Sequence, residues 1–293
     1  MKIIDSHHHI WRRADLPWLL GPTQPRIFGP YDEIKRDYLI GEFLNDLKGT
    51  GVEKSVYVQA NWAPNWFEDE VAWVQKTADE TGWPHGIVGY CNMLQDDVRS
   101  DLDKLEKYPL MRGIRQQLHW HENPLYRFAP HADLARDNRL QQNVRHLADY
   151  GWSFDLQVFD GQMDGASELA AACPDVTFIL QHAGMLEDLS DEGRANWQKN
   201  TKKLAKNKNV VSKLSAFGTF IHRNDANHIK WMIEKTVAIF GAKRCLFGSN
   251  FPIEKIWTSY AALIKAFTNA TSGMSAAKQK LIFHDTAKRV YRL

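Results

Sequence analysis

Short runs of apolar and β-branched residues recur along the chain, and segments with a helical pattern lie between most of them. The runs cover residues 2–6, 54–59, 85–92, 111–118, 153–159, 176–181, 210–215 and 245–249. Helical patterns cover 66–81, 98–107, 139–150, 166–172 and 229–240, and 284–293 is typical of a closing helix. Strands that alternate with helices indicate βα units and a parallel sheet. Eight such units predict an α/β fold, a (β/α)8 TIM barrel rather than a doubly wound sheet.

The length of the chain agrees with one barrel. A barrel of about 250 residues accommodates most of the 293 residues, so we expect residues 1–293 to form a single domain. The segment 12–39 has no clear periodicity and contains Pro17, Pro22, Pro25 and Pro30. Loops of this length in compact proteins are usually functional or disordered. We interpret the segment as a long ordered excursion over the barrel mouth after strand 1, with a flexible linker as the alternative.

Composition and charge exclude several classes of partner. Apolar residues make up 44% of the chain, charged residues 25%, and the net charge is +2, which is ordinary for a globular protein. This charge does not indicate binding to nucleic acid or to a membrane surface, so we expect a small-molecule substrate. Cys91, Cys173 and Cys245 are far apart without metal-site spacing, which favours the reducing cytoplasm. The oligomeric state stays open, a homo-oligomer included.

The first strand ends in a histidine cluster, Asp-Ser-His-His-His, that begins at Asp5. Alternation on a strand would place Asp5, His7 and His9 on one face and His8 on the other. Two imidazoles that share a small space suit metal binding, acid–base catalysis or polarisation of a carbonyl. The alternative is a hydrogen-bonded structural histidine of the core.

Further polar residues come at the ends of later strands, where barrel enzymes carry their sites. The candidates are Arg115, Gln117, His119, His121, Asp155, Gln157, His182, Lys213, Ser215 and Asn250. Residues of equal parity, such as Arg115 with Gln117, share a face of their strand. Periodicity alone does not say which face points to the barrel axis, because both faces of these strands are buried. We expect His131, His222 and His228 to lie on the surface.

Several short motifs in this order resemble the amidohydrolase superfamily. They are Asp-x-His-x-His at Asp5, Arg-Gly-Ile-Arg ending at Arg115, His-Ala-Gly at His182, Lys-Leu-Ser at Lys213 and Phe-Gly-Ser-Asn-Phe-Pro around Asn250. More narrowly, they resemble the amidohydrolase-2 branch of sugar-lactone and 2-pyrone-4,6-dicarboxylate lactonases. The similarity extends from His7 almost to the end of the chain.

The resemblance implies a hydrolase with His7, His9 and His182 at the centre of its site. Arg115 would hold a carboxylate or polarise the scissile carbonyl. Many relatives have a metal-binding aspartate at the position of Asn250. An amide is neither an anionic ligand nor a base, although it can donate to an oxyanion or fix a turn. Three histidines alone can hold zinc, but the missing carboxylate shifts our expectation slightly towards a site without a divalent metal.

Several candidates have two open roles. Asp155 is either a base or a group that orients a neighbour. Lys213 either binds an anionic substrate or pairs with Asp155, and we favour the internal pair. We expect Gln117, His119, His121, Gln157 and Trp62 to contact substrate, although packing is the commoner role of any single tryptophan.

Hydrolysis of a small sugar-acid or dicarboxylate lactone explains most of these residues. Water would attack the ester carbonyl, a histidine or Asp155 would accept the proton, and Arg115, Asn250 or a bound ion would stabilise the oxyanion. The alternatives are a metal-dependent decarboxylase of an unsaturated or aromatic acid, against which Asn250 counts, and a catalytically silent barrel that binds a sugar acid.

Overall fold

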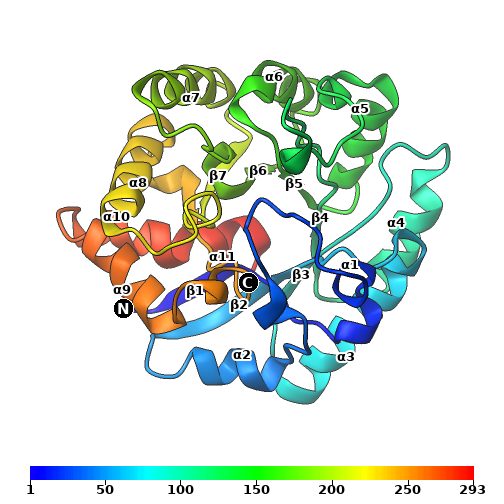
Figure 1. Cartoon of the computed structure of the whole chain (residues 1–293). Coiled ribbons are helices and arrows are strands. Elements are labelled where there is room, and N and C mark those ends of the chain that lie inside the picture. The colour runs from blue at the N-terminus through cyan, green and yellow to red at the C-terminus, as the bar shows by residue number, and fades with distance from the viewer.

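The computed structural model describes all 293 residues and contains an eight-stranded parallel barrel (Figure 1). The strands follow chain order and each pairs with the next. They are β1 Ile3–His8, β2 Val52–Val58, β3 Gly86–Gly89, β4 Met111–Ile114, β5 Ser153–Leu156, β6 Phe178–Leu180, β7 Val210–Leu214 and β8 Cys245–Phe247. Every strand falls on a run that the sequence predicts, so the (β/α)8 prediction is confirmed.

The barrel closes between its first strand and the residues after its last. Asn250 donates its backbone N–H to the His7 carbonyl at 2.7 Å, and His9 donates to the Phe251 carbonyl at 2.7 Å. The Ser6 hydroxyl donates to the Phe247 carbonyl at 2.5 Å. The two ends of the chain's motif pattern, the histidine cluster and the segment around Asn250, are therefore hydrogen-bonded neighbours.

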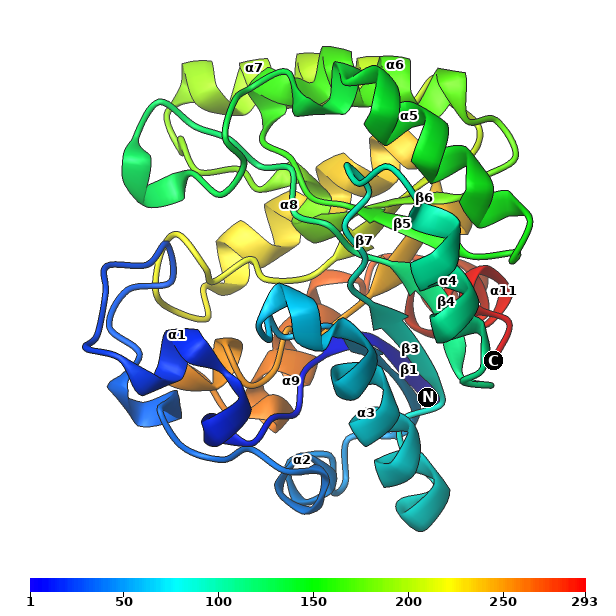
Figure 2. The ribbon, with the colours of Figure 1, turned by 90° about the vertical axis from the view of Figure 1, so that its right-hand side faces the viewer.

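Helices surround the strands in both views (Figure 2). They are α1 Pro17–Leu20, α2 Ile40–Asp46, α3 Phe67–Thr81, α4 Val98–Glu106, α5 Asn138–Arg145, α6 Met163–Ala172, α7 Asp191–Leu204, α8 Ala226–Phe240, α9 Tyr260–Ala270, α10 Ala276–Lys280 and α11 Thr286–Tyr291. Side-chain carboxylates or hydroxyls cap several of their first turns, as Asp97 does for α4 and Asp225 for α8. Such caps satisfy backbone N–H groups that a helix leaves without partners. No helix combines the length and the apolar character that a membrane crossing requires.

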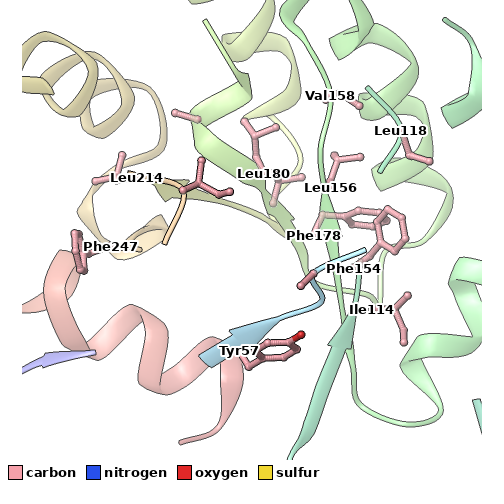
Figure 3. Packing of buried hydrophobic residues seen from close by; sticks show 14 of the residues in the cluster. Tyr57, Ile114, Leu118, Phe154, Leu156, Val158, Phe178, Leu180, Leu214 and Phe247 are labelled. Atoms are coloured by element: carbon pink, nitrogen blue, oxygen red, sulfur yellow. The ribbon is translucent and has the colours of Figure 1, made fainter. Parts of the chain in front are cut away.

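Alternate residues of the strands face two different cores. Residues such as Ile114, Phe154, Phe178 and Phe247 point outward and pack in the large cluster shared with the helices (Figure 3). A smaller cluster fills the barrel interior. It consists of Ile4, Val56, Val58, Val88, Ile179, Val211, Leu246, Ala287, Val290 and Tyr291. Ala287, Val290 and Tyr291 belong to α11, so this closing helix covers one end of the barrel with apolar side chains.

The alternation expected for β1 is interrupted. The register between β1 and β2 shifts between Asp5 and His8, as at a β-bulge. The carboxylate of Asp5 accepts hydrogen bonds from the Ser249 hydroxyl at 2.6 Å and from the Tyr260 hydroxyl of α9 at 2.9 Å. Asp5 therefore does not join His7 and His9, and the prediction that the three share one face is wrong for Asp5.

The segment 12–39 is an ordered excursion, as expected for a loop of this length in a compact protein. Trp11 and Tyr38 exchange backbone hydrogen bonds of 2.8 and 2.9 Å at its base. Trp18, Phe28 and Tyr31 pack edge-on or tilted against one another within it. The His222 ring lies 3.0 Å from the Ile27 carbonyl and links the excursion to the segment after β7. Figure 2 shows the blue excursion beside this yellow segment, at the mouth of the barrel.

Candidate active site

A cavity of about 490 Å³ opens at the carboxyl ends of the strands. Eight of the residues predicted from the sequence line it: His9, Trp62, Arg115, Gln117, His119, Gln157, His182 and Asn250. His7, His121, Asp155 and Lys213 do not line it. The inward face of β4 and β5 is thus the one that carries Arg115, Gln117 and Gln157, which periodicity alone had left open. Two further tryptophans, Trp11 and Trp18, also line the cavity.

Three histidines meet at the cavity floor. The Nε2 atoms of His7 and His9 are 3.3 Å apart, and the rings of His7 and His182 are 4.9 Å apart. The Nδ1 atom of His9 lies 2.6 Å from the Val58 carbonyl, so it carries a proton and leaves Nε2 as an acceptor. The Nδ1 atom of His182 lies 2.8 Å from the Ser215 hydroxyl, and no protein group bonds its Nε2 atom. His182 therefore presents a free nitrogen at the cavity.

Burial keeps these imidazoles neutral. Desolvation is the largest cause that lowers the pKa of His7, His9 and His182 well below 6.5, and the charges of Arg115 and Lys213 add to it. A neutral imidazole retains a lone pair at neutral pH, so each can accept a proton. Its conjugate acid is unstable in this environment and returns the proton readily.

Arg115 supplies a buried cation beside the histidines. Its guanidinium donates to the Gln59 carbonyl, and its Nε–H is buried without a partner. Burial lowers the pKa of Arg115 to about 10, so the side chain stays protonated at neutral pH. A buried donor without an acceptor is costly in a folded protein. The guanidinium therefore lacks an acceptor for this N–H within the protein, and the part of Arg115 that lines the cavity is suited to an acceptor that a ligand brings.

Asp155 and Lys213 form a fully buried ion pair below the cavity. The Lys213 ammonium lies 2.9 Å from the Asp155 carboxylate, and neither side chain is exposed. Gln181 and Tyr291 also donate to this carboxylate, at 2.8 and 3.3 Å. Of the two roles left open for each residue, the geometry matches the internal pair. Neither side chain touches the cavity, which leaves both without access to substrate.

His121 is also engaged away from the cavity. Its Nε2 atom lies 3.2 Å from the Glu187 carboxylate, and its ring packs against Tyr126 and Phe159. His119, by contrast, lines the cavity, and its pKa is lowered to about 3 by burial and by Arg115. Among the histidines expected on the surface, His131 and His222 are exposed. His228 is only 9% exposed, because the face of α8 that carries it packs on the barrel, and that prediction is wrong.

Asn250 adopts a left-handed backbone conformation, with φ of 57°, at the cavity wall. Its side-chain amide lies close to the buried carboxyl of Glu254. Glu254 accepts from the Trp257 indole at 2.9 Å and from the Thr219 hydroxyl at 3.4 Å. Burial raises the pKa of Glu254 to about 7. The amide of Asn250 thus lies beside a carboxyl group that the sequence pattern did not single out.

Other cavity residues were missed as well. Arg26 lies in the excursion, Gln59 directly follows β2, and Thr219 lies in the loop after β7. Polar positions after strands could have indicated Gln59. Nothing in the pattern of an aperiodic segment identifies Arg26 as a cavity residue, because its placement depends on contacts with residues far away in the chain.

The histidines do not fit a resident divalent ion. The 3.3 Å between the Nε2 atoms of His7 and His9 matches the edge of a zinc tetrahedron, about 3.3 Å for Zn–N bonds of 2.0–2.1 Å. No three side chains among His, Cys, Asp and Glu converge on one position, however. Two cations lie near the histidines, Arg115 and Lys213, and the carboxylate of Asp155 is already paired with Lys213. The histidine group therefore lacks both a third converging ligand and an unpaired anionic partner for a divalent ion.

The comparisons with known proteins agree with this architecture. The family model described as amidohydrolase matches residues 4–293. The chain is 37% identical over 295 residues to the uncharacterized protein y4mH of Sinorhizobium fredii, covering 100% of this chain and 99% of the relative. It is 28% identical over 305 residues to L-fucono-1,5-lactonase of Burkholderia multivorans, covering 99% and 96%. A crystal structure of an amidohydrolase from Burkholderia multivorans with bound Zn has a TM-score of 0.84 and 25% identity, and covers 100% of both chains. With a family match over nearly its whole length, the chain belongs to the amidohydrolase family.

Proposed function

We propose that this amidohydrolase opens a small lactone by attack of water on the ester carbonyl. The observation that carries the proposal is the presence of His182, with its free Nε2 atom, and of the buried cation Arg115 on one cavity. A general base and an oxyanion donor are the two parts that ester hydrolysis needs. Lactonases among the relatives support the choice of a cyclic ester.

The reaction divides between these two side chains. When the Nδ1–H of His182 donates to Ser215, the Nε2 lone pair takes a proton from water while the water oxygen bonds to the acyl carbon. Arg115 stabilises the negative charge that develops on the carbonyl oxygen. Collapse of the tetrahedral intermediate breaks the bond from the acyl carbon to the ring oxygen, which takes the proton from His182. The product is an open-chain hydroxy acid, which releases one proton at neutral pH.

Asn250 and the pair His7 and His9 play supporting parts. The amide of Asn250, beside Glu254, is a neutral donor on the cavity wall. The contact between His7 and His9 holds the ring of His9 towards the floor of the cavity. Buried ionised carboxylates are absent from the cavity lining, so nothing there repels the developing oxyanion.

Proton release from a lactone panel that includes L-fucono-1,5-lactone tests this function. His182→Ala and Arg115→Ala should each reduce kcat/KM by roughly 10²- to 10³-fold, the size of a lost oxyanion donor, while circular dichroism shows a folded protein. Arg112→Ala is the matched control, since Arg112 lies on the same strand with its guanidinium bonded to the Pro109 and Met111 carbonyls. Full activity in both cavity variants would overturn the proposal.

A further inference from the structure

The cavity is lined by cations that have no acidic partners. Arg26, Arg115 and Arg127 line it, and no Asp, Glu or Lys does. None of the three arginines forms an ion pair, although Arg12 and Arg36 on the same excursion as Arg26 bind Asp15 and Glu42. The positive charge in the cavity is thus much denser than the net charge of +2 on the chain. A concave site with charge of one sign attracts ligands of the opposite sign.

Arg26 differs from the other two arginines because its guanidinium forms no hydrogen bond or ion pair within the protein. Its Nε atom is buried and has no hydrogen-bond partner. Its guanidinium interacts only with the ring of Trp18, whose centroid lies 5.8 Å from the Cζ atom of Arg26. A planar guanidinium with free donors matches a carboxylate in a two-pronged arrangement. Arg26 is therefore in the state expected of a residue that awaits an anionic ligand.

The other two arginines are already engaged. Arg127 donates to the carbonyls of His121 and Glu122 at 3.1 and 3.0 Å and stacks on Trp120, with its Cζ atom 4.7 Å from the ring. Arg115 donates to the Gln59 carbonyl at the cavity floor, beside the histidines. The floor arginine serves the neutral ester carbonyl, so an anionic group elsewhere on the substrate is left to Arg26 on the excursion.

We propose that the substrate is a lactone that carries a carboxylate, and that Arg26 binds this carboxylate while the ester carbonyl lies at Arg115. The inference rests on the proposed lactonase function and narrows its substrate class to anions. Trp18, Trp62 and Phe28 line the same cavity and supply flat apolar surfaces for the lactone ring. The excursion is then a specificity element that selects charged over neutral lactones.

A matched pair of substrates tests the inference. The δ-lactone of 2-hydroxyadipate carries one free carboxylate, and its primary amide has nearly the same shape without the charge. The ratio of kcat/KM for the acid to that for the amide should be roughly tenfold or more in the wild type, as for charge-assisted hydrogen bonds. It should fall close to one in Arg26→Gln and lie between these values in Arg26→Lys. Arg13→Gln should leave the ratio unchanged, because Arg13 is an exposed residue of the same excursion outside the cavity.

The outcomes separate this inference from the proposed function. The proposal of an anionic substrate would be overturned if the lactone that carries the amide opens at least as fast as the lactone that carries the acid, or if the ratio is unchanged in Arg26→Gln. Either result would leave the lactonase proposal intact. If neither lactone is hydrolysed, the lactonase proposal fails for this class, and calorimetric binding of 2-hydroxyadipate decides the role of Arg26. Binding that weakens roughly tenfold in Arg26→Gln but not in Arg13→Gln would support that role. Equal binding by both variants would overturn it.

Discussion

The two ends of the barrel differ in the polarity of their buried side chains. At the amino end, side chains such as Ile4, Val56 and Leu246 pack against Tyr291 of the closing helix and are fully buried. At the carboxyl end, buried polar atoms of Arg26, Trp62, Arg115, Gln117, His119 and Gln157 have no partner. Apolar packing stabilises a fold, whereas unpartnered buried polar groups destabilise it. The comparison teaches that this chain stabilises one end of its barrel and reserves the other for a ligand.

Backbone conformation follows the same division. Five residues other than glycine that line the cavity have positive φ: Asn61, His182, Met185, Ala216 and Asn250. Such conformations are uncommon for these residue types and cluster at functional sites. The residues lie within five positions of the ends of β2, β6, β7 and β8, in the loops that follow these strands. The strain therefore lies where side chains must be aimed into the cavity.

Lys213→Met should have the largest effect, because the Lys213–Asp155 pair separates the two ends. The variant leaves the Asp155 carboxylate buried without its cation, which should lower the free energy of unfolding by about 3–5 kcal/mol. Urea unfolding measures the loss. The double variant Lys213→Met/Asp155→Leu, which removes both charges, should recover a large part of it. A loss of about 1 kcal/mol or less, the size of a surface pair, would contradict the assignment of this pair to the core.

Val56→Ala should weaken the apolar end alone. Removing two methyl groups from a fully buried side chain should cost about 2 kcal/mol of unfolding free energy. The folded enzyme should keep its kcat/KM, because Val56 does not line the cavity. Val52→Ala, at the half-buried start of the same strand, should cost less in the same unfolding experiment. A fall in kcat/KM without loss of stability would contradict the claim that Val56 serves stability and not the reaction.

Asn250→Asp tests the carboxyl end by adding a negative charge to it instead of removing a side chain. The new carboxylate would face Glu254 and the developing oxyanion, so we expect kcat/KM to fall roughly tenfold or more. Steady-state proton release at pH 7.5, with and without added zinc, measures the effect. Higher activity in the variant than in the wild type would indicate a lapsed aspartate-dependent site instead of an amide-assisted one.

His8→Phe should give the smallest effect, on acid stability. His8 is buried and stacks on Phe43 at 3.9 Å, and burial lowers its pKa to about 3. Below pH 6.5 the unfolded chain takes up a proton that the folded chain refuses, so stability falls as pH falls. From pH 7.5 to 6.0 the loss from His8 is about 0.8 kcal/mol. The variant should therefore lose about that much less than the wild type over this interval, as followed by urea unfolding at both pH values. An identical pH dependence would show that His8 is not buried in its neutral form.

Much of this division could be read from the sequence. Buried β-rich runs are a strong signal, and all eight strands were predicted from them. The polar residues after the strands could be named because parallel strands bring their carboxyl ends to one side of a barrel. Parity along β4 and β5 grouped Arg115 with Gln117 correctly. It could not tell inward from outward, since both faces are buried.

The rest depended on contacts that a local pattern does not contain. The bulge in β1 removes Asp5 from the histidine group, and no alternation rule predicts a bulge. Arg26 reaches the cavity because its excursion is held by Trp11, Tyr38 and His222, the last of them 195 residues from Ile27. Glu254 becomes significant only through burial beside Asn250. Tertiary neighbours, not local sequence, thus decide which polar residues face the substrate.

Turnover after removal of metal tests the central claim most directly. The protein would be treated with dipicolinate, its metal content measured, and hydrolysis of the 2-hydroxyadipate δ-lactone followed by proton release. Arg115, His182 and the absence of a three-ligand group predict an unchanged kcat/KM at a metal content far below one ion per chain. Loss of activity on chelation, restored by stoichiometric zinc, would contradict an account in which side chains alone perform the hydrolysis.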